Sequence, residues 1–190
     1  MFRHTGLYRK PHDDGRITMS NKKAVKKQFG RSADAYVESE GHRKGKDLEK
    51  LIALAAITGD ETALDVATGG GHTANALAPL VRRVIALDLT PEMLAAAKAF
   101  IEGNGHDNVD FVQGNAEAMP FPDGSFDIVA CRIAPHHFPH VERFIAEVHR
   151  VLKPSGQFLL DDNVAPEDDE GDAFYNTLEK KRDYSHYRAW

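Results

Sequence analysis

The chain has 190 residues, 42% of them hydrophobic and 28% charged, and its net charge at neutral pH is −5. This length suits one domain, and the composition is globular rather than disordered or of low complexity. No run approaches the roughly 18 to 20 apolar residues that cross a bilayer, and residues 1–20 lack the apolar middle of a signal peptide, so we expect a cytoplasmic protein without a membrane span.

Positive charge is concentrated near the N-terminus. Residues 1–50 contain 13 Lys and Arg against 7 Asp and Glu, which leaves 11 against 22 in the rest of the chain. An acidic main part argues against a broad nucleic-acid-binding surface, so no nucleic-acid partner is predicted. The basic stretch Lys22 to Lys27 is typical of the solvated face of a helix, although it remains able to meet an anion.

The N-terminal part is expected to precede the main domain. Residues 1–18 carry Gly, Pro and charged residues without periodicity, which predicts a flexible leader. Residues 19–45 have apolar residues at helical spacing, which predicts an N-terminal helical cap. The main domain is expected over 46–165, and its first element is a helix that ends before Gly59.

Five apolar segments with the character of strands follow, at residues 61–67, 84–88, 109–113, 126–131 and 156–162. Helical patterns separate them: one is capped by Thr90 and opened by Pro91, and a later one has Phe144 and Val148 on its apolar face. This alternation predicts an α/β fold with a Rossmann-like, doubly wound parallel sheet and helices on both faces. A ligand is expected at the carboxyl ends of the strands.

The first strand ends in a glycine-rich turn, DVATGGGHTA at residues 65–74. Such a turn offers backbone N–H groups to a ligand at a helix N-terminus, and the spacing of Gly69 and Gly71 also suits the pyrophosphate of a dinucleotide. Asp65 argues against the pyrophosphate, because a carboxylate repels it and attracts an ammonium group. The two charges of the amino-acid part of S-adenosylmethionine (SAM) match Asp65 and the turn. The alternative makes Asp65 a buried turn-former.

The second strand ends at Asp88, about 20 residues beyond the turn, where a carboxylate can accept hydrogen bonds from both hydroxyls of a ribose. NAD and SAM both satisfy this pattern. The alternative is a helix cap, but Thr90 and Pro91 are expected to supply the cap and to leave the Asp88 carboxylate free.

Four segments in order, LDVATGGGHTA, VIALDLTPEML, GNAEAMPFPDGSFDIVACRIAPHHF and RVLKPSGQFLL, resemble class I SAM-dependent methyltransferases. The nearest group is the ubiquinone/menaquinone-biosynthesis-like branch, also called methyltransferase type 11. The resemblance runs from about Leu48 to Asp162. It implies a sheet of strand order 3-2-1-4-5, SAM as the cofactor and S-adenosylhomocysteine (SAH) as its product.

The resemblance also implies cofactor contacts. Its pattern places the methionine part of SAM among Asp65, Ala67, Gly69 and Gly71, with the strand end Cys131-Arg132 beneath it. The ribose is expected on Asp88, and the adenine beside Leu89, Met93, Asn115 and Ala116. Tyr36 is expected to close the pocket from the N-terminal side.

Three residues depart from the family pattern. Ala67 replaces the usual first glycine, Asn115 replaces the usual acid, and Ser155 replaces a glycine of the Lys-Pro-Gly-Gly turn. Asn115 still offers an amide oxygen to the adenine amino group, so the substitution is compatible with SAM.

His136, His137 and His140 follow the fourth strand, where the family places residues that face the substrate. We predict His137 as a general base, against the alternative that these histidines pack within the loop. No metal site is expected, because no thiolate or clustered acid accompanies them. The acidic stretch from Asp161 to Asp172 lacks calcium-loop spacing and predicts a solvated loop.

The segment 166–190 is expected to form either a helical lid or a poorly ordered tail, because the chain leaves no room for the antiparallel hairpin that usually follows the fifth strand in the family. We therefore expect a truncated C-terminal region. The fifth strand would then lie at an unpaired sheet edge, which favours a possible homo-oligomer through that edge.

These patterns predict an enzyme that transfers a methyl group from SAM to a C-, O- or N-nucleophile of a small molecule by in-line displacement. The alternatives are an NAD-dependent oxidoreductase, which the glycine turn and Asp88 favour, and a SAM-binding protein without catalytic activity.

Overall fold

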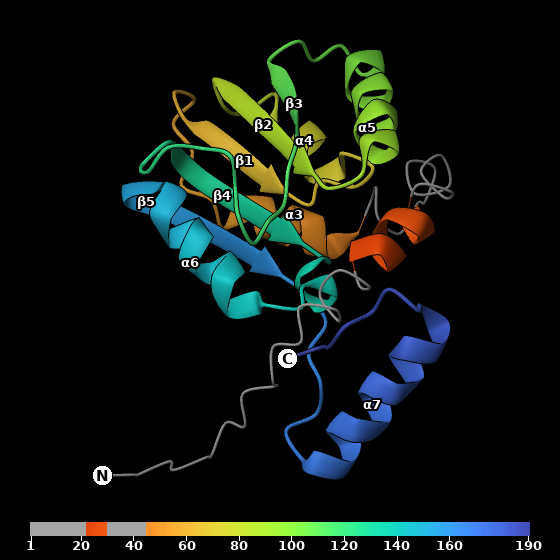
Figure 1. Ribbon diagram of the computed structural model, residues 1–190. Coiled ribbons are helices and arrows are strands. Elements are labelled where there is room, and N and C mark those ends of the chain that lie inside the picture. The colour runs from red at the N-terminus through yellow and green to blue at the C-terminus, as the bar shows by residue number, and fades with distance from the viewer. Residues whose placement is uncertain (1–21, 30–44) are drawn as a thin grey trace, which may run out of the picture.

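The computed structural model describes residues 22–29 and 45–190 (Figure 1). A helix occupies residues 22–29, and the later elements are α3 (Lys46–Ala53), β1 (Thr62–Val66), α4 (His72–Leu77), β2 (Arg83–Asp88), α5 (Pro91–Gly103), β3 (Val109–Gln113), β4 (Phe126–Arg132), the 3-10 turn η1 (Pro135–His137), α6 (Val141–Val151), β5 (Leu152–Asp161) and α7 (Asp169–Arg182). The expected leader, Tyr36 and much of the expected cap lie outside the described residues.

The five strands form one parallel sheet of order β3-β2-β1-β4-β5, which confirms the predicted α/β fold and strand order. The last residue of β1, Val66, pairs with Leu87 of β2 on one side and with Cys131 of β4 on the other. The carboxyl ends of these three strands are therefore level, so the residues that follow them meet at one edge of the sheet.

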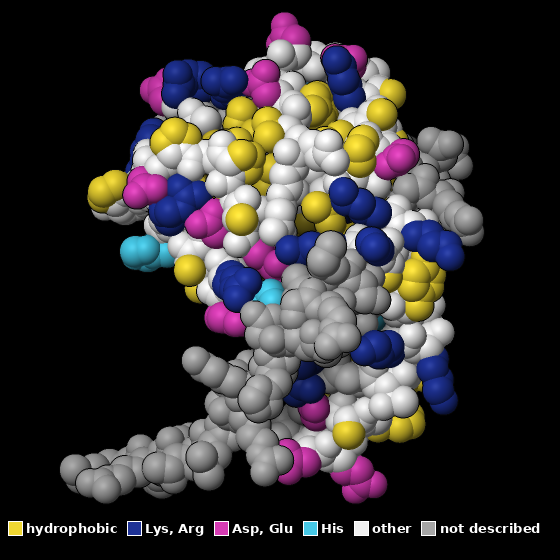
Figure 2. All heavy atoms as spheres, in the orientation of Figure 1, with side chains coloured by type: hydrophobic (Ala, Val, Ile, Leu, Met, Phe, Trp, Pro, Cys, Tyr) yellow, Lys and Arg dark blue, Asp and Glu magenta, His cyan; other side chains and the backbone are white. Residues whose placement is uncertain are grey.

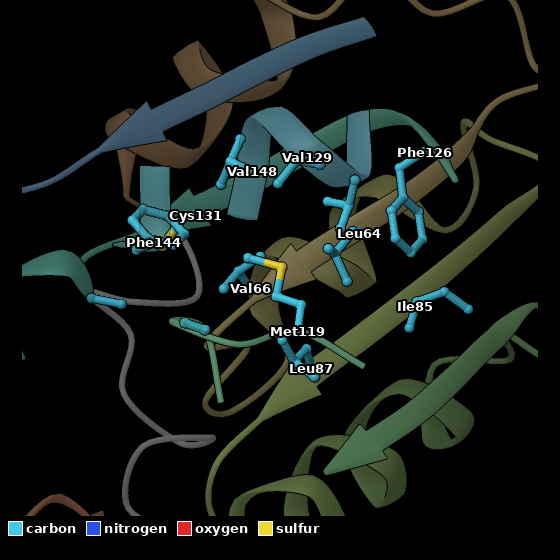
Figure 3. Close-up of a cluster of buried hydrophobic side chains, with 13 residues drawn as sticks. Leu64, Val66, Ile85, Leu87, Met119, Phe126, Val129, Cys131, Phe144 and Val148 are labelled. Carbon is cyan, nitrogen blue, oxygen red and sulfur yellow. The ribbon is translucent and has the colours of Figure 1, made fainter. Parts of the chain in front are cut away.

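Apolar side chains cover both faces of the sheet. On one face, α3, α4 and α5 pack Leu51, Leu77 and Ile101 against the strands. On the other face, α6 packs Phe144 and Val148 against the cluster shown in Figure 3. Each large side chain that is fully buried in this way contributes about 1.5 to 3 kcal/mol to folding, so the two layers fix the strand ends in place.

β5 is longer than predicted, because it begins at Leu152 rather than near Gly156. Its register with β4 shifts between the pairs Phe126–Leu152 and Ile128–Gln157, so the intervening residues bulge out of the ladder. Ser155 lies in this bulge with a φ of 66°, a conformation that favours glycine, which is the usual family residue at this position. Lys153 holds the bulge by contacts of 2.9 and 2.8 Å to the two oxygens of Asp127 on β4.

The structure differs from the solvated loop expected for the acidic stretch, because Asp168 is the N-cap of α7 and the acidic residues after it lie in the helix. The Asp168 side chain accepts a hydrogen bond of 2.7 Å from the backbone N–H of Gly171, which is an N-cap contact. Acidic residues of the first turn and basic residues of the last turn complement the helix dipole. Within the segment 166–190, the helix α7 occupies Asp169–Arg182.

The segment after α7 packs against the turn that follows β4. The backbone N–H groups of Tyr187 and Arg188 donate to the carbonyl oxygen of His136 at 2.8 and 3.0 Å. Ser185, His186 and Ala189 are buried in this contact. The end of the described chain is thereby brought back to the carboxyl edge of the sheet, as Figure 1 shows.

Positive and negative side chains are intermingled on the face of the molecule in Figure 2. Exposed ion pairs such as Arg83–Asp110, at 2.6 Å, contribute at most about 1 kcal/mol each, so the sheet depends on its apolar layers. None of the helices in the described residues is long and apolar enough to span a membrane.

Candidate functional site

A cavity of about 450 Å³ opens at the carboxyl edge of the sheet, within the usual size range of small-molecule sites. It lies among the ends of β1, β2 and β4, the loop after β3, the helix over 22–29 and the segment after α7. Its lining includes these residues predicted from the sequence: Asp65, Ala67, Gly69, Asp88, Leu89, Met93, Asn115, Ala116, Arg132 and His137.

Two predicted cofactor residues within the described ranges, Cys131 and Gly71, do not line the cavity. Tyr36 lies outside the described residues. Cys131 is fully buried in the apolar cluster under α6, because it points to the sheet face opposite to its neighbour Arg132. Gly71 is the N-cap of α4 with a φ of 83°, and a Cβ there would lie only 2.9 Å from the side chains of Ala97 and Ile101. Close packing against α5 thus explains this glycine.

Gly69 has a different role from Gly71. Its φ is 53°, and a Cβ at this position would meet only the carbonyl oxygen of Ala67, at 4.0 Å. The turn therefore presents bare backbone to the cavity, and this space fits the carboxylate end of an amino acid.

Asp65 projects from β1 and is almost completely buried. Its Oδ2 accepts hydrogen bonds from the Thr68 hydroxyl at 2.6 Å and from the backbone N–H of Ala74 at 3.0 Å. Burial raises the pKa of this carboxyl to about 7, although the two hydrogen bonds oppose the shift. Asp65 therefore organises the turn and still lines the cavity, where an ammonium group would stabilise its charged form.

Asp88 is not left free as expected. Its Oδ1 accepts from the backbone N–H of Thr90 at 2.8 Å, and its Oδ2 accepts from the N–H of Gly69 at 2.9 Å. Thr90 is the N-cap residue of α5, but its side chain makes no capping hydrogen bond, so that part of the prediction is wrong. Burial raises the pKa of Asp88. Each carboxylate oxygen has a second lone pair, so ribose hydroxyls can still donate to it.

Arg132 connects the end of β4 to α3. Its Nε lies 2.7 Å from Asp47 Oδ2, and the guanidinium side chain is 5% exposed. Burial alone would raise the pKa of Asp47, but the hydrogen bond and the positive charge of Arg132 outweigh burial and lower it. Nothing in the sequence indicated this pair, since the two residues are far apart in the chain.

The helix over 22–29 covers part of the cavity with Val25 and Phe29. It is fastened by Lys22, whose Nζ lies 2.8 Å from Glu117, a nearly buried carboxylate after β3. Glu117 also accepts a hydrogen bond of 2.9 Å from the backbone N–H of His140. The basic stretch is thus only partly the solvated face that we expected.

Two residues at strand ends adopt a positive φ without being glycine: Ala67 at 55° and Ile133 at 51°. This conformation costs roughly 1 to 2 kcal/mol for a residue with a Cβ. Both residues line the cavity, and such strain is found most often at ligand sites. Ala67 stands where the family usually has glycine, and its positive φ is a conformation that favours glycine.

The three histidines after β4 have different surroundings. His136 Nδ1 lies 2.6 Å from Asp162 Oδ1, whereas His137 Nδ1 lies 3.1 Å from the carbonyl oxygen of Ser185. Burial and the neighbouring His136 lower the pKa of His137 to about 4. His136 and His137 line the cavity. Asp162 and Ser185 were not predicted as site residues, because their contacts depend on how distant segments pack.

The fold and this cavity define a class: an α/β protein with a ligand-sized cavity at the carboxyl edge of its parallel sheet. A model of the family described as "Methyltransferase domain" matches residues 64–160, just over half of the chain. The chain therefore belongs to this family of class I SAM-dependent methyltransferases, whose cofactor is SAM. This membership favours a methyltransferase over the NAD-dependent alternative.

Among its relatives, the chain is 45% identical over 160 residues to the "Uncharacterized methyltransferase YcgJ" of Bacillus subtilis, covering 84% of this chain and 63% of the relative. It is 37% identical over 110 residues to the ubiquinone/menaquinone biosynthesis C-methyltransferase UbiE of Methylobacterium nodulans, covering 58% of this chain and 40% of the relative. The chain thus spans less than two thirds of the length of these relatives.

Solved structures have the same fold. The crystal structure of a putative methyltransferase from Bacillus halodurans is 60% identical, with a TM-score of 0.74 over 77% of this chain and 63% of that one. The structure of YcgJ is 46% identical, with a TM-score of 0.73 over 76% of this chain and 62% of that one.

Proposed function

We propose that this protein transfers a methyl group to a small-molecule acceptor. The observation that carries the proposal is the convergence of Asp65, the bare turn at Gly69 and Asp88 on one cavity. When bound, SAM supplies an electrophilic methyl group on a positively charged sulfonium. The chain has to hold the nucleophile of the acceptor close to that methyl group, in line with the bond that breaks, and to exclude water.

The proposed cofactor contacts divide between the strand ends. Asp65 and the N–H groups of the turn are complementary to the ammonium and carboxylate groups of an amino acid. Asp88 accepts the ribose hydroxyls, and Leu89 and Met93 form an apolar wall beside the adenine. Asn115 and Ala116 meet its edge. Each of these side chains lines the cavity, which supports the assignment.

The rest of the cavity is the proposed acceptor end. It combines aromatic side chains, Phe29 and Phe138, with the histidine pair His136 and His137 and with Arg182 at the end of α7. This lining suits an acceptor with an apolar body and a polar group. A hydroxyl or carbon acid needs a base for its proton, and the histidine pair is placed to supply one.

Calorimetry distinguishes the proposal from its alternatives. We expect SAM and SAH to bind and NADH not to bind. A ligand at 100 times its dissociation constant should raise the free energy of unfolding by about 2.7 kcal/mol. Binding of NADH without SAM would contradict the proposal. If SAM binds but none of a wide panel of hydroxyl, carbon-acid and amine acceptors releases SAH, the protein is a SAM-binding protein without methyl transfer.

We also propose that two copies associate through the outer edge of β5. Among the described strands β5 pairs only with β4, and Leu160 on it is 47% exposed. An unpaired edge of this kind favours pairing with another chain. We expect light scattering to give twice the monomer mass, and a charge at this position, Leu160→Lys, to return the protein to a monomer. A wild-type monomer at high concentration would contradict the proposal.

A further inference from the structure

One carboxylate holds both the ring and the backbone of His136. Asp162 Oδ1 lies 2.6 Å from Nδ1 of the ring, and Asp162 Oδ2 accepts the backbone N–H of the same residue at 2.8 Å. The two side chains are only 9% and 10% exposed. Because an ionised carboxylate can only accept, Nδ1 must carry a hydrogen, and in the neutral ring Nε2 is then the nitrogen with a free electron pair.

The ring of His136 is held on further sides. It stacks on His186 at a centroid distance of 5.3 Å and lies 4.1 Å from the ring of His137. Its backbone carbonyl accepts from Tyr187 and Arg188. The residue lines the cavity, and its Nε2 makes no hydrogen bond with any described residue. These contacts hold the ring of His136 in one orientation, and Nε2 is the ring nitrogen that remains to accept a proton.

His137, the base predicted from the sequence, is less well suited. Its Nδ1 contacts the neutral carbonyl of Ser185 rather than a carboxylate. Burial and the neighbouring His136 lower its pKa to about 4, although the charge of Asp183 opposes the shift, so His137 is a weak proton acceptor at neutral pH. The Asp162 contact supplies both an orientation and a counter-charge to His136, as in catalytic carboxylate–histidine pairs.

We propose that His136 is the catalytic base for the acceptor and that Asp162 is its positioning residue. This rests on the proposed methyl transfer. The acceptor atom bonds to the methyl carbon while the bond between that carbon and sulfur breaks, its electron pair staying on the sulfur of the departing SAH. The acceptor's own bond to hydrogen breaks, the proton bonds to His136 Nε2, and the electron pair of that bond stays on the acceptor atom. The resulting imidazolium faces the Asp162 carboxylate and later gives the proton to water. The acceptor class is therefore a hydroxyl compound or a carbon acid.

Asp162→Asn tests the positioning role with little change of shape. The amide oxygen can still accept the backbone N–H of His136, while the amide NH2 faces Nδ1 and donates to it. The ring hydrogen then moves to Nε2, so the histidine remains in place but its accepting nitrogen is blocked.

The tautomer is measured by ¹⁵N NMR on the full chain with labelled histidine, with and without SAH. His136→Gln identifies the signals of His136, and the spectra are followed with pH because the ionisable side chains of Asp162, His137, His186 and Asp183 lie nearby. We expect the Nδ1–H tautomer in the wild type and the Nε2–H tautomer in Asp162→Asn. An Nε2–H wild type, or the same tautomer in both proteins, would overturn the proposal whatever the turnover.

Turnover gives the second test, measured as SAH release with catechol as the hydroxyl probe and acetylacetone as the carbon acid. We expect Asp162→Asn and His136→Gln to lower kcat about 100-fold or more, with KM and SAM affinity unchanged. His149→Gln, on the exposed face of α6, is the matched control and should keep wild-type turnover. Loss of kcat in His137→Gln but not in His136→Gln would overturn the assignment. Failure of SAM binding in the wild type would instead refute the proposed function.

Discussion

Asp65→Asn is expected to stabilise the ligand-free protein at pH 8 and to abolish most of its SAM binding. The stability gain follows from the burial of a charge. In the folded chain the pKa of Asp65 is raised from 3.8 to about 7 by burial, so above pH 7 a charged carboxylate is held away from water. An asparagine oxygen can accept the same hydrogen bonds from Thr68 and Ala74 without that cost.

The pKa of Asp65 also predicts how the stability difference between the wild type and Asp65→Asn changes with pH. Between pH 4 and pH 7 the folded chain binds the Asp65 proton and the unfolded chain does not, so this group lowers wild-type stability as pH rises through that window. The variant lacks this loss. Its advantage over the wild type should therefore be absent near pH 4, grow up to about pH 7 and then stay constant, as measured by urea denaturation.

The expected loss of SAM binding comes from the same carboxylate. Removing a buried charged partner of an ammonium group costs about 2 to 3 kcal/mol, on the order of 30- to 150-fold in dissociation constant. Wild-type binding should also weaken as pH falls below about 7, because Asp65 is then protonated. Calorimetry at pH 6 and pH 8 measures both effects. A variant with wild-type affinity would make Asp65 a turn-former alone.

Asp88→Ala is expected to weaken SAM binding by about 1 to 3 kcal/mol, roughly 5- to 150-fold, because both ribose hydroxyls lose a charged acceptor. The substitution also leaves the N–H groups of Gly69 and Thr90 without their acceptor. Circular dichroism must therefore show that the variant is folded before its dissociation constant is measured by calorimetry.

A surface carboxylate provides the control for Asp88. Asp110 on β3 is half exposed and pairs with Arg83, so Asp110→Ala should leave both stability and SAM affinity nearly unchanged. A folded Asp88→Ala protein that binds SAM as tightly as Asp110→Ala would show that the ribose lies elsewhere.

Local patterns were sufficient to predict the sheet, its helices and the two carboxylates at the strand ends. Runs of apolar residues, glycine punctuation and the Thr90-Pro91 helix start are properties of neighbouring residues, and Asp65 and Asp88 follow directly from where their strands end. The strand order came from resemblance to the family rather than from these patterns. Of the 13 residues that the motifs predicted for the site, 10 line the cavity.

The direction and partners of individual side chains depend on contacts between distant segments. Gly71 and Cys131 belong to the matched motifs, yet packing against α5 and the alternation of β4 turn them away from the cavity. Asp162 reaches His136 only because β5 lies beside β4, and Lys22 reaches Glu117 only because a helix folds across the strand ends. The two residues of each pair are far apart in the sequence, and a shift of one residue in strand register moves a side chain to the opposite face of the sheet. These contacts are therefore determined by tertiary packing.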